Sequence, residues 1–274
     1  MGEILTEIFS APMLVRALIV GVLVSLCAAL LGVSLVLKRF SMIGDGLSHV
    51  GFGALAIAAV MNLAPMAVAI PVVIAAAFLL LRLSSGGKLK GDAVIALIST
   101  GALAIGVMAV SMSKGMNIDI NSYLFGSIIS VSRSDVAISA VLAASVLLMF
   151  VFFYTKIFAI TFDESFAKAT GINVGLYNML IALLTAVTIV IGMRLMGSML
   201  ISGLIIFPAL CSMRVFKSFF SVTVCSAVVS VTSFVAGMVI SYAADTPCGA
   251  SIVCVNIVMF AGFAAVGAVK ARIK

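Results

Sequence analysis

Residues 41–53 read SMIGDGLSHVGFG and belong to a long apolar segment that begins directly after the basic pair Lys38-Arg39. The stretch contains a carboxylate, Asp45, and the only histidine of the chain, His49. Residues four apart lie within about 40° of each other around an α-helix, so both side chains would leave the same face. Because an ionisable group in the hydrocarbon of a membrane costs about 2.5–3.5 kcal/mol, a membrane helix with two such groups calls for a functional explanation.

The composition places this stretch in a membrane protein. Hydrophobic residues make up 64% of the 274 residues and charged residues only 9%, against about 25% charged residues in a soluble domain. The apolar residues fall into runs of about twenty with short polar breaks, which indicates an all-α polytopic membrane protein. The net charge of +7 does not indicate a nucleic-acid partner, because the cations stand at the ends of apolar runs, where they anchor helices at the lipid surface.

We expect about nine transmembrane helices in a single transmembrane domain that covers residues 1–274. The connection near Arg194 is tight enough for a re-entrant turn, in which case eight helices would cross the membrane. The expected spans are Leu14–Leu37, Phe40–Asn62, Pro65–Leu83, Ala93–Ser113, Val136–Tyr154, Val174–Met193, Leu195–Met213, Phe219–Ala243 and Ala250–Val269.

The distribution of lysine and arginine sets the expected orientation. Of the 16 cations, only Arg16, Lys114, Arg133 and Arg194 fall on one side of the expected spans, and all the others fall on the opposite side. By the positive-inside rule, the C-terminus is cytoplasmic and, with nine spans, the N-terminus is external. The first apolar run is too long for a signal peptide, so we expect it to be retained as the first span.

Two connections between spans have patterns of their own. The external residues 123–131 read YLFGSIISV and are too short to cross a membrane, so we expect a re-entrant or interfacial helix there. The cytoplasmic segment from Lys156 to Asn173 suits a short amphipathic helix that Gly171 ends as a C-terminal cap. Such a segment can dock on a cytoplasmic partner, although it can also be a solvated linker. The residues that suit this helix are Asp163, Glu164, Phe166, Ala167 and Ala169.

Asp45 and His49 together offer oxygen and nitrogen ligands that suit zinc, or the harder manganese ion. If the basic pair marks the inner membrane boundary, a rise of about 1.5 Å per residue places Asp45 about 9–10 Å deep and His49 near the midplane. Two ligands alone would hold an ion poorly, whereas a symmetric dimer would bring together two carboxylates and two imidazoles. The alternative is a buried polar pair that satisfies itself and fixes a helix in place.

Pro208 lies within an expected span, where it removes a backbone hydrogen bond and would kink the helix. This kink would be either a structural bend or a gating hinge. The five cysteines show no C-x-x-C spacing, so we interpret them as buried thiols rather than as disulfides or metal ligands.

Several short motifs occur in an order and at spacings that resemble the permease subunits of ABC importers for zinc, manganese and iron. The resemblance extends from about residue 14 to residue 269. Its motifs are Gly44-Asp45-x-Leu47-Ser48-His49 after a basic pair, Tyr123-Leu-Phe-Gly126, Met196-Gly197-Ser198 leading to Ile205-Ile-Phe-Pro208-Ala209, and Asp245-Thr-Pro-x-Gly249.

The resemblance implies a homodimer in the cytoplasmic (inner) membrane of a bacterium or archaeon. Two cytoplasmic ATPase subunits would use ATP, and an external metal-binding protein would deliver the ion. By the same resemblance, Asp45 and His49 would be pathway ligands, and Asp163–Gly171 would seat in the ATPase. The chain itself would be a transport subunit without covalently bound cofactor and not an enzyme, which agrees with the lack of a glycine-rich loop followed by Lys-Ser/Thr.

The transported ion is expected to be zinc, with manganese or iron as alternatives. The manganese branch of the family often carries a proline a few residues after the histidine, and the sequence Val50-Gly-Phe-Gly53 lacks it. The element Tyr123-Leu-Phe-Gly-Ser127 also looks more like the zinc branch.

Three other function classes compete with this interpretation. A proton-coupled secondary metal transporter would use Asp45 and His49 as a proton relay and would need no ATPase. A membrane-embedded metalloprotease requires a fuller ligand set in one chain, such as two histidines and a glutamate, and a single histidine argues against it. A purely structural subunit would leave the cost of the two ionisable groups unexplained.

Overall fold

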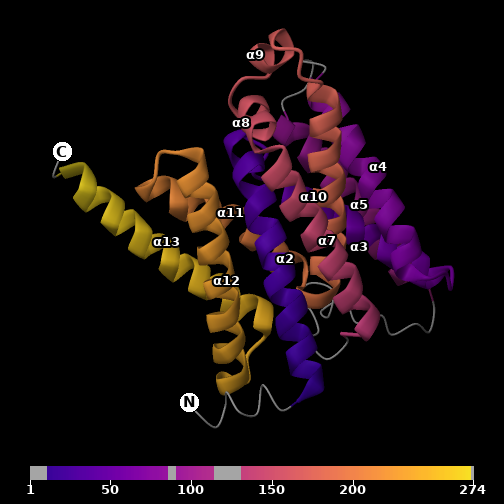
Figure 1. Cartoon of the computed structure of the whole chain (residues 1–274). Helices are drawn as coiled ribbons and strands as arrows, with labels where there is room; N and C mark the ends of the chain where they lie inside the picture. Colours follow the sequence, from indigo (N-terminus) through magenta and orange to yellow (C-terminus); the bar gives the residue numbers. More distant parts are fainter. Residues whose placement is uncertain (1–10, 86–90, 114–130, 273–274) are drawn as a thin grey trace.

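The computed structural model describes residues 11–85, 91–113 and 131–272 of the chain, and the regular secondary structure of this part consists of helices, without a strand (Figure 1). The helices are α2 (Pro12–Leu37), α3 (Ile43–Val60), α4 (Pro65–Ser85), α5 (Gly91–Met112), α7 (Arg133–Phe152), α8 (Tyr154–Phe162), α9 (Glu164–Ala169), α10 (Val174–Met196), α11 (Ser198–Val215), α12 (Phe219–Ala244) and α13 (Cys248–Arg272).

Within the described residues, nine helices are long and apolar enough to cross a membrane, which confirms the all-α polytopic fold. The other two, α8 and α9, are short and lie together at one end of the bundle (Figure 1). A single residue, Gly197, with φ +88°, separates α10 from α11, so both are candidate spans and the count of eight is not needed. The helix expected over residues 123–131 lies, up to residue 130, outside the described residues.

The arrangement places α3 among other helices rather than at the edge. It packs against α4, α5, α10 and α11. Of its 18 residues, 72% are buried inside the chain, against 11% of the residues in the most hydrophobic 18-residue stretch of α13. In Figure 1, α2 runs between a group formed by α3, α4 and α5 and a second group formed by α12 and α13, and α11 contacts both α2 and α3. Because α3 also has the lowest mean hydropathy of the nine candidate spans, 1.4, its burial shields a comparatively polar helix from lipid.

Glycines explain how neighbouring helices come so close to α3. A Cβ atom added at Gly53 would stand 2.5 Å from the carbonyl oxygen of Ala102 on α5, and one added at Gly46 would stand 2.5 Å from Cγ2 of Ile95 on the same helix. Small residues at such positions let two helix backbones pack together in a membrane. The close contact between α3 and α5 therefore depends on glycine at positions 46 and 53.

The connection between α2 and α3 is a hydrogen-bonded turn, which we call the elbow (residues 38–42). Arg39 takes a positive φ of 64°, its N–H donates to the carbonyl of Val36, and the N–H of Phe40 donates to the carbonyl of Leu35. These two bonds form a Schellman motif, in which the residue after the helix end turns the chain back. As a result, α3 begins at Ile43, three residues later than the span expected from Phe40.

Beyond the bundle, α9 is fixed at both ends. The side chain of Asp163 accepts hydrogen bonds from the backbone N–H groups of Ser165 and Phe166, as expected of a helix N-cap. Gly171 has φ +81° and follows the helix as its C-terminal cap. Ala167 is fully buried in a small apolar cluster with Ile160, Val174 and Tyr177. This cluster holds α9 against the start of α10.

Candidate functional site

Asp45 and His49 lie one turn apart in the first half of α3 and face each other. The Nε2 atom of His49 lies 3.7 Å from Oδ2 of Asp45, and the two side chains are 22% and 44% exposed, respectively. Asp45 belongs to the first turn of α3, where the positive end of the helix dipole favours a carboxylate. Helix geometry therefore explains part of the preference for Asp45, but it does not explain an imidazole one turn further on.

The neighbours of α3 leave open the face that carries this pair. Gly44 points towards Ile205 of α11, and Gly46 points towards Ile95 of α5. Asp45 stands between these two directions, because successive residues turn by about 100° around a helix. The pair therefore faces the opening between α5 and α11 and is neither sealed inside the chain nor fully exposed on its outside.

The donor atoms of the pair suit a borderline metal ion. Nδ1 of His49 is buried and has no hydrogen-bond partner among the described residues, and the carboxylate of Asp45 offers two oxygens. The neighbouring hydroxyl does not compete as a ligand, because Oγ of Ser48 is fully buried and donates to the backbone carbonyl of Asp45 at 2.8 Å. Imidazole and carboxylate together are ligands of zinc and also of manganese.

One chain supplies too few ligands for a closed site. In the described part of the chain, no group of three or more His, Cys, Asp or Glu residues could hold a metal ion. Because protein-held zinc is usually bound by three or four protein ligands, Asp45 and His49 would need ligands from elsewhere.

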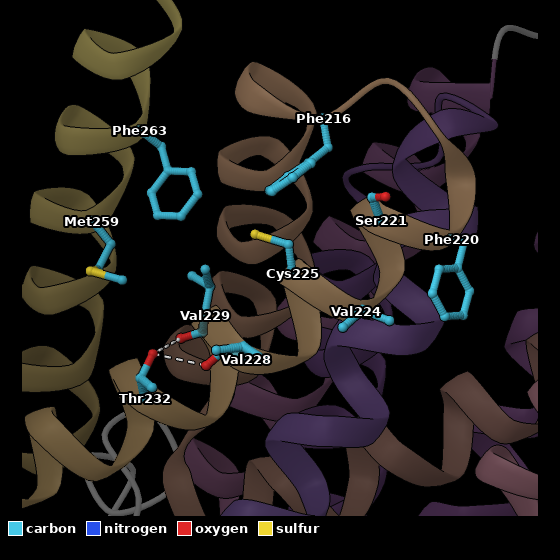
Figure 2. Close-up of a pocket in the computed structure, with 10 residues that line it drawn as sticks. All are labelled: Phe216, Phe220, Ser221, Val224, Cys225, Val228, Val229, Thr232, Met259 and Phe263. Carbon is cyan, nitrogen blue, oxygen red and sulfur yellow. Dashed lines mark hydrogen bonds between the residues drawn. The ribbon is translucent and has the colours of Figure 1, made fainter.

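A groove between α12 and α13 offers a contrast to this site (Figure 2). It has a volume of about 590 Å³ and is lined mostly by apolar side chains, among which Figure 2 shows Phe216, Phe263 and Met259. Its one threonine, Thr232, donates to the backbone carbonyls of Val228 and Val229 at 2.8 and 3.0 Å. Such a lining suits hydrocarbon and offers no ligand set for an ion.

The residues of α8 and α9 that are predicted to contact an ATPase fall into two groups. Phe166 is 61% exposed and, together with exposed Phe158 and Phe162, gives this end of the protein an aromatic surface. Ala167 is buried, and Asp163 and Gly171 cap the short helix. These residues shape and support the segment, whereas the three phenylalanines are available to a partner.

Glu164 belongs to neither group, because it points back towards the bundle. Its Oε1 atom lies 2.8 Å from Nζ of Lys38 and accepts a hydrogen bond of 3.0 Å from Nδ2 of Asn178. Nζ of Lys38 also donates to Oδ1 of Asn178. The sequence analysis explained Lys38 as part of the basic pair at the membrane boundary, and it carried no signal that would have joined Lys38 or Asn178 to Glu164.

The surroundings of this ion pair shift both pKa values. Burial lowers the pKa of Lys38, while the hydrogen bond and the charge of Glu164 act in the opposite direction. Burial alone would raise the pKa of Glu164, but hydrogen bonds from Lys38 and Asn178, together with nearby lysine charges, outweigh it and leave that pKa lowered. The carboxylate is therefore held in its charged form.

Pro208 lies inside α11, which continues through it from Ser198 to Val215. The carbonyl of Pro208 accepts a hydrogen bond of 2.8 Å from Oγ of Ser212. The role of Pro208 as a gating hinge stays a prediction.

Comparisons with known proteins agree with the motifs. Residues 10–266 match the ABC 3 transport family. The chain is 26% identical over 244 residues to the high-affinity zinc uptake system membrane protein ZnuB of Haemophilus influenzae, covering 89% of this chain and 94% of that protein. It is 28% identical over 255 residues to the manganese transport system membrane protein MntC of Halalkalibacterium halodurans, covering 93% and 87%.

The fold is also found among solved structures. PsaBC from Streptococcus pneumoniae in complex with Fab superposes with a TM-score of 0.84 and 27% sequence identity, and the match covers 96% of this chain and 94% of that one. The resemblance seen in the motifs is thus confirmed over nearly the whole length. The chain belongs to the ABC 3 transport family, as the membrane-spanning permease subunit of an ABC transporter and not as its ATPase.

Proposed function

We propose that this permease imports a divalent transition-metal ion into the cytoplasm, driven by ATP that a partner subunit hydrolyses. The observation that carries the proposal is the pair Asp45 and His49, which face each other 3.7 Å apart on a membrane helix without being sealed by the chain's own side chains. Charged or polar groups of this kind inside a span line ion pathways far more often than they merely support packing.

A second copy of the chain would complete the site. Partly exposed ionisable side chains cannot face lipid without a large cost, so the opening between α5 and α11 has to be covered by protein or by water. A homodimer with its twofold axis at this opening would bring the same two residues of a second copy next to Asp45 and His49. The resulting two carboxylates and two imidazoles form a four-ligand set that zinc accepts.

Zinc is the favoured ion among zinc, manganese and iron. The relatives include proteins named for zinc and for manganese at similar identities, so overall similarity does not choose between them. The choice of zinc is supported by imidazole, which suits zinc well, and by the missing proline after His49 in Val50-Gly-Phe-Gly53. Carboxylates also accept manganese, so competition between the ions is the direct measurement.

The segment of α8 and α9 would be the contact with the ATPase. By the positive-inside rule, this end of the bundle is cytoplasmic, the C-terminus lies on the same side and the N-terminus lies outside, in a bacterial or archaeal cytoplasmic membrane. Exposed Phe158, Phe162 and Phe166 provide an aromatic surface of the kind that is enriched at protein interfaces. An external metal-binding protein would deliver the ion from the opposite side.

Reconstitution tests the proposal directly. The permease, its ATPase and its binding protein are placed in lipid vesicles, and ATP-dependent zinc uptake is followed with a zinc-sensitive dye inside the vesicles. We expect Asp45→Asn and His49→Ala each to reduce zinc uptake by at least about tenfold, because each removes a ligand, whereas Ser48→Ala retains it.

Two results would overturn the proposal. If both ligand variants took up zinc at the wild-type rate, Asp45 and His49 would not be pathway ligands. Zinc uptake by the isolated chain under a proton gradient, without the ATPase, would instead favour a proton-coupled secondary transporter. Manganese and iron added as competitors in the same vesicles rank the three ions.

A further inference from the structure

Three side chains from distant parts of the chain form a closed set of polar contacts, which we call the elbow cluster (Lys38, Glu164 and Asn178). Lys38 stands at the end of α2, Glu164 is the first residue of α9, and Asn178 lies in the second turn of α10. Nζ of Lys38 lies 2.8 Å from Oε1 of Glu164, the Asn178 amide donates to the same oxygen at 3.0 Å, and Lys38 donates to the Asn178 carbonyl oxygen. Each of the three groups thus contacts the other two.

The elbow cluster differs from an ordinary surface ion pair in its burial. The side chain of Lys38 is only 9% exposed, although that of Glu164 is 44% exposed. Exposed lysines usually hold their ammonium groups in water and contribute little through ion pairs. Here the ammonium group is covered and is held by two acceptors, so moving Glu164 away would leave a buried charge unpaired.

The position of Lys38 links this cluster to the candidate metal ligands. Lys38 is the C-cap of α2 and the first residue of the elbow, which the Schellman bonds from Arg39 to Val36 and from Phe40 to Leu35 hold in place. Asp45 follows Lys38 by seven residues and already belongs to the first turn of α3. Because the residues between them are held by backbone hydrogen bonds, a shift of Lys38 is passed to the start of α3 rather than absorbed by a slack loop.

We propose that the elbow cluster is the mechanical connection between the ATPase-docking segment and the metal-binding helix. In this proposal, which rests on the proposed function, a displacement of α9 by the ATPase pulls Lys38 through Glu164 and turns the start of α3. Glu164 is then a positioning residue for Asp45 and His49 and not part of the docking surface. An element can shift the equilibrium between the two transport states only if its contacts differ between them.

The test separates coupling from assembly. Lys38→Met and Glu164→Gln are reconstituted with the ATPase and binding protein. Two quantities are measured: the zinc transported per ATP hydrolysed, and the amount of ATPase that co-purifies with the permease. We expect both variants to retain the ATPase and to hydrolyse ATP, while zinc transported per ATP falls by about fivefold or more, the lower range of coupling between linked sites. Lys217→Met, which removes an exposed cytoplasmic lysine, is the matched control and leaves the ratio unchanged.

Exchange of the two charges distinguishes coupling from a loss of packing. In the double variant K38E/E164K the ion pair is reversed, and the Asn178 amide can serve both partners because it has a donor and an acceptor. We expect this variant to recover most of the zinc transported per ATP that the single variants lose. If a single variant does not fold and cannot be purified, Asn178→Ala is used in its place, because it weakens the cluster and leaves the ion pair.

The proposal is overturned if the single variants transport as much zinc per ATP as the wild type. It is also overturned if they lose the ATPase altogether, since Glu164 would then belong to the docking surface. An absence of ATP-driven zinc, manganese or iron uptake by the wild type would instead reject the proposed function, independently of the elbow cluster.

Discussion

A single methyl group at Gly53 tests the packing that positions His49. A Cβ atom there would stand 2.5 Å from the carbonyl oxygen of Ala102 and 3.2 Å from its carbonyl carbon. Both are backbone atoms of α5, so neither can turn aside as the end of a flexible side chain would. We therefore expect Gly53→Ala to push α5 away from α3, one turn beyond His49.

The expected cost follows from the size of the collision. The carbonyl oxygen would have to retreat by about 0.9 Å to reach 3.4 Å, where ordinary van der Waals contact begins. Overpacking of this kind costs about 1–3 kcal/mol. Alanine also stabilises the folded helix by about 1 kcal/mol relative to glycine, because it is the better helix former. The free energy of unfolding should therefore fall by about 1 kcal/mol, and zinc uptake should fall with it.

Two other glycines provide matched controls. A Cβ atom added at Gly101 of α5 or at Gly262 of α13 meets no atom of the described residues within 4 Å. These substitutions bring the same gain in helix propensity without the collision, so their difference from Gly53→Ala isolates the packing cost of about 1–3 kcal/mol.

Unfolding in mixed detergent micelles, followed by the loss of the helical circular dichroism signal, gives the three free energies. If Gly53→Ala matches both controls within about 0.5 kcal/mol, which is the usual error of additivity, then α3 and α5 do not approach each other as closely as described. The reasoning would fail at its first step.

Three further changes have defined outcomes. Gly197→Ala puts a side chain at φ +88° and ψ 158° and should cost about 1–3 kcal/mol of unfolding free energy; an unchanged melting temperature would mean that the turn between α10 and α11 relaxes freely. Ser48→Ala removes a hydrogen bond within α3 and should cost about 1 kcal/mol with zinc uptake retained, whereas lost uptake in a folded variant would make Ser48 a ligand. Because the pKa of Glu164 is lowered in the folded protein, its ion pair stabilises above the unfolded pKa of about 4.3, so the melting-temperature difference between wild type and Glu164→Gln should shrink as the pH falls below this value.

The number and order of the candidate spans were predictable because each depends on a local property. A run of apolar residues long enough to cross a membrane identifies itself wherever it stands in the chain. Even the tight turn at Gly197 left a signal, since glycine readily takes a positive φ. The end of α2 at Leu37 was predicted as well, because the basic pair Lys38-Arg39 interrupts the apolar run. The turn of the elbow was not predicted, because Arg39 has φ 64°, a conformation that arginine seldom adopts, and α3 therefore begins at Ile43 rather than at Phe40.

The candidate site was predictable only as far as helix periodicity reaches. A spacing of four residues was enough to place Asp45 and His49 on one face, as the 3.7 Å separation requires. The estimate of their depth assumed a helix that runs on from the basic pair, whereas α3 begins at Ile43, and the depth itself stays a prediction. The elbow cluster was out of reach, because Lys38 and Asn178 are 140 residues apart and a lysine at the end of an apolar run already has a sufficient explanation as an anchor.

The location of the metal-ligand candidates near the elbow has a mechanical consequence. A helix with its side chains has a radius of about 5–6 Å, so a rotation of α3 by about 30° about its own axis would move the side-chain ends by roughly 3 Å. Metal–ligand distances tolerate only about 0.2 Å. A set of ligands shared between two copies of α3 would therefore be broken by a rotation of this size. Since Asp45 and His49 stand in the first two turns after the elbow, a pull on Lys38 would reach them before the rest of α3 could bend. The ion would be released by turning its ligands apart.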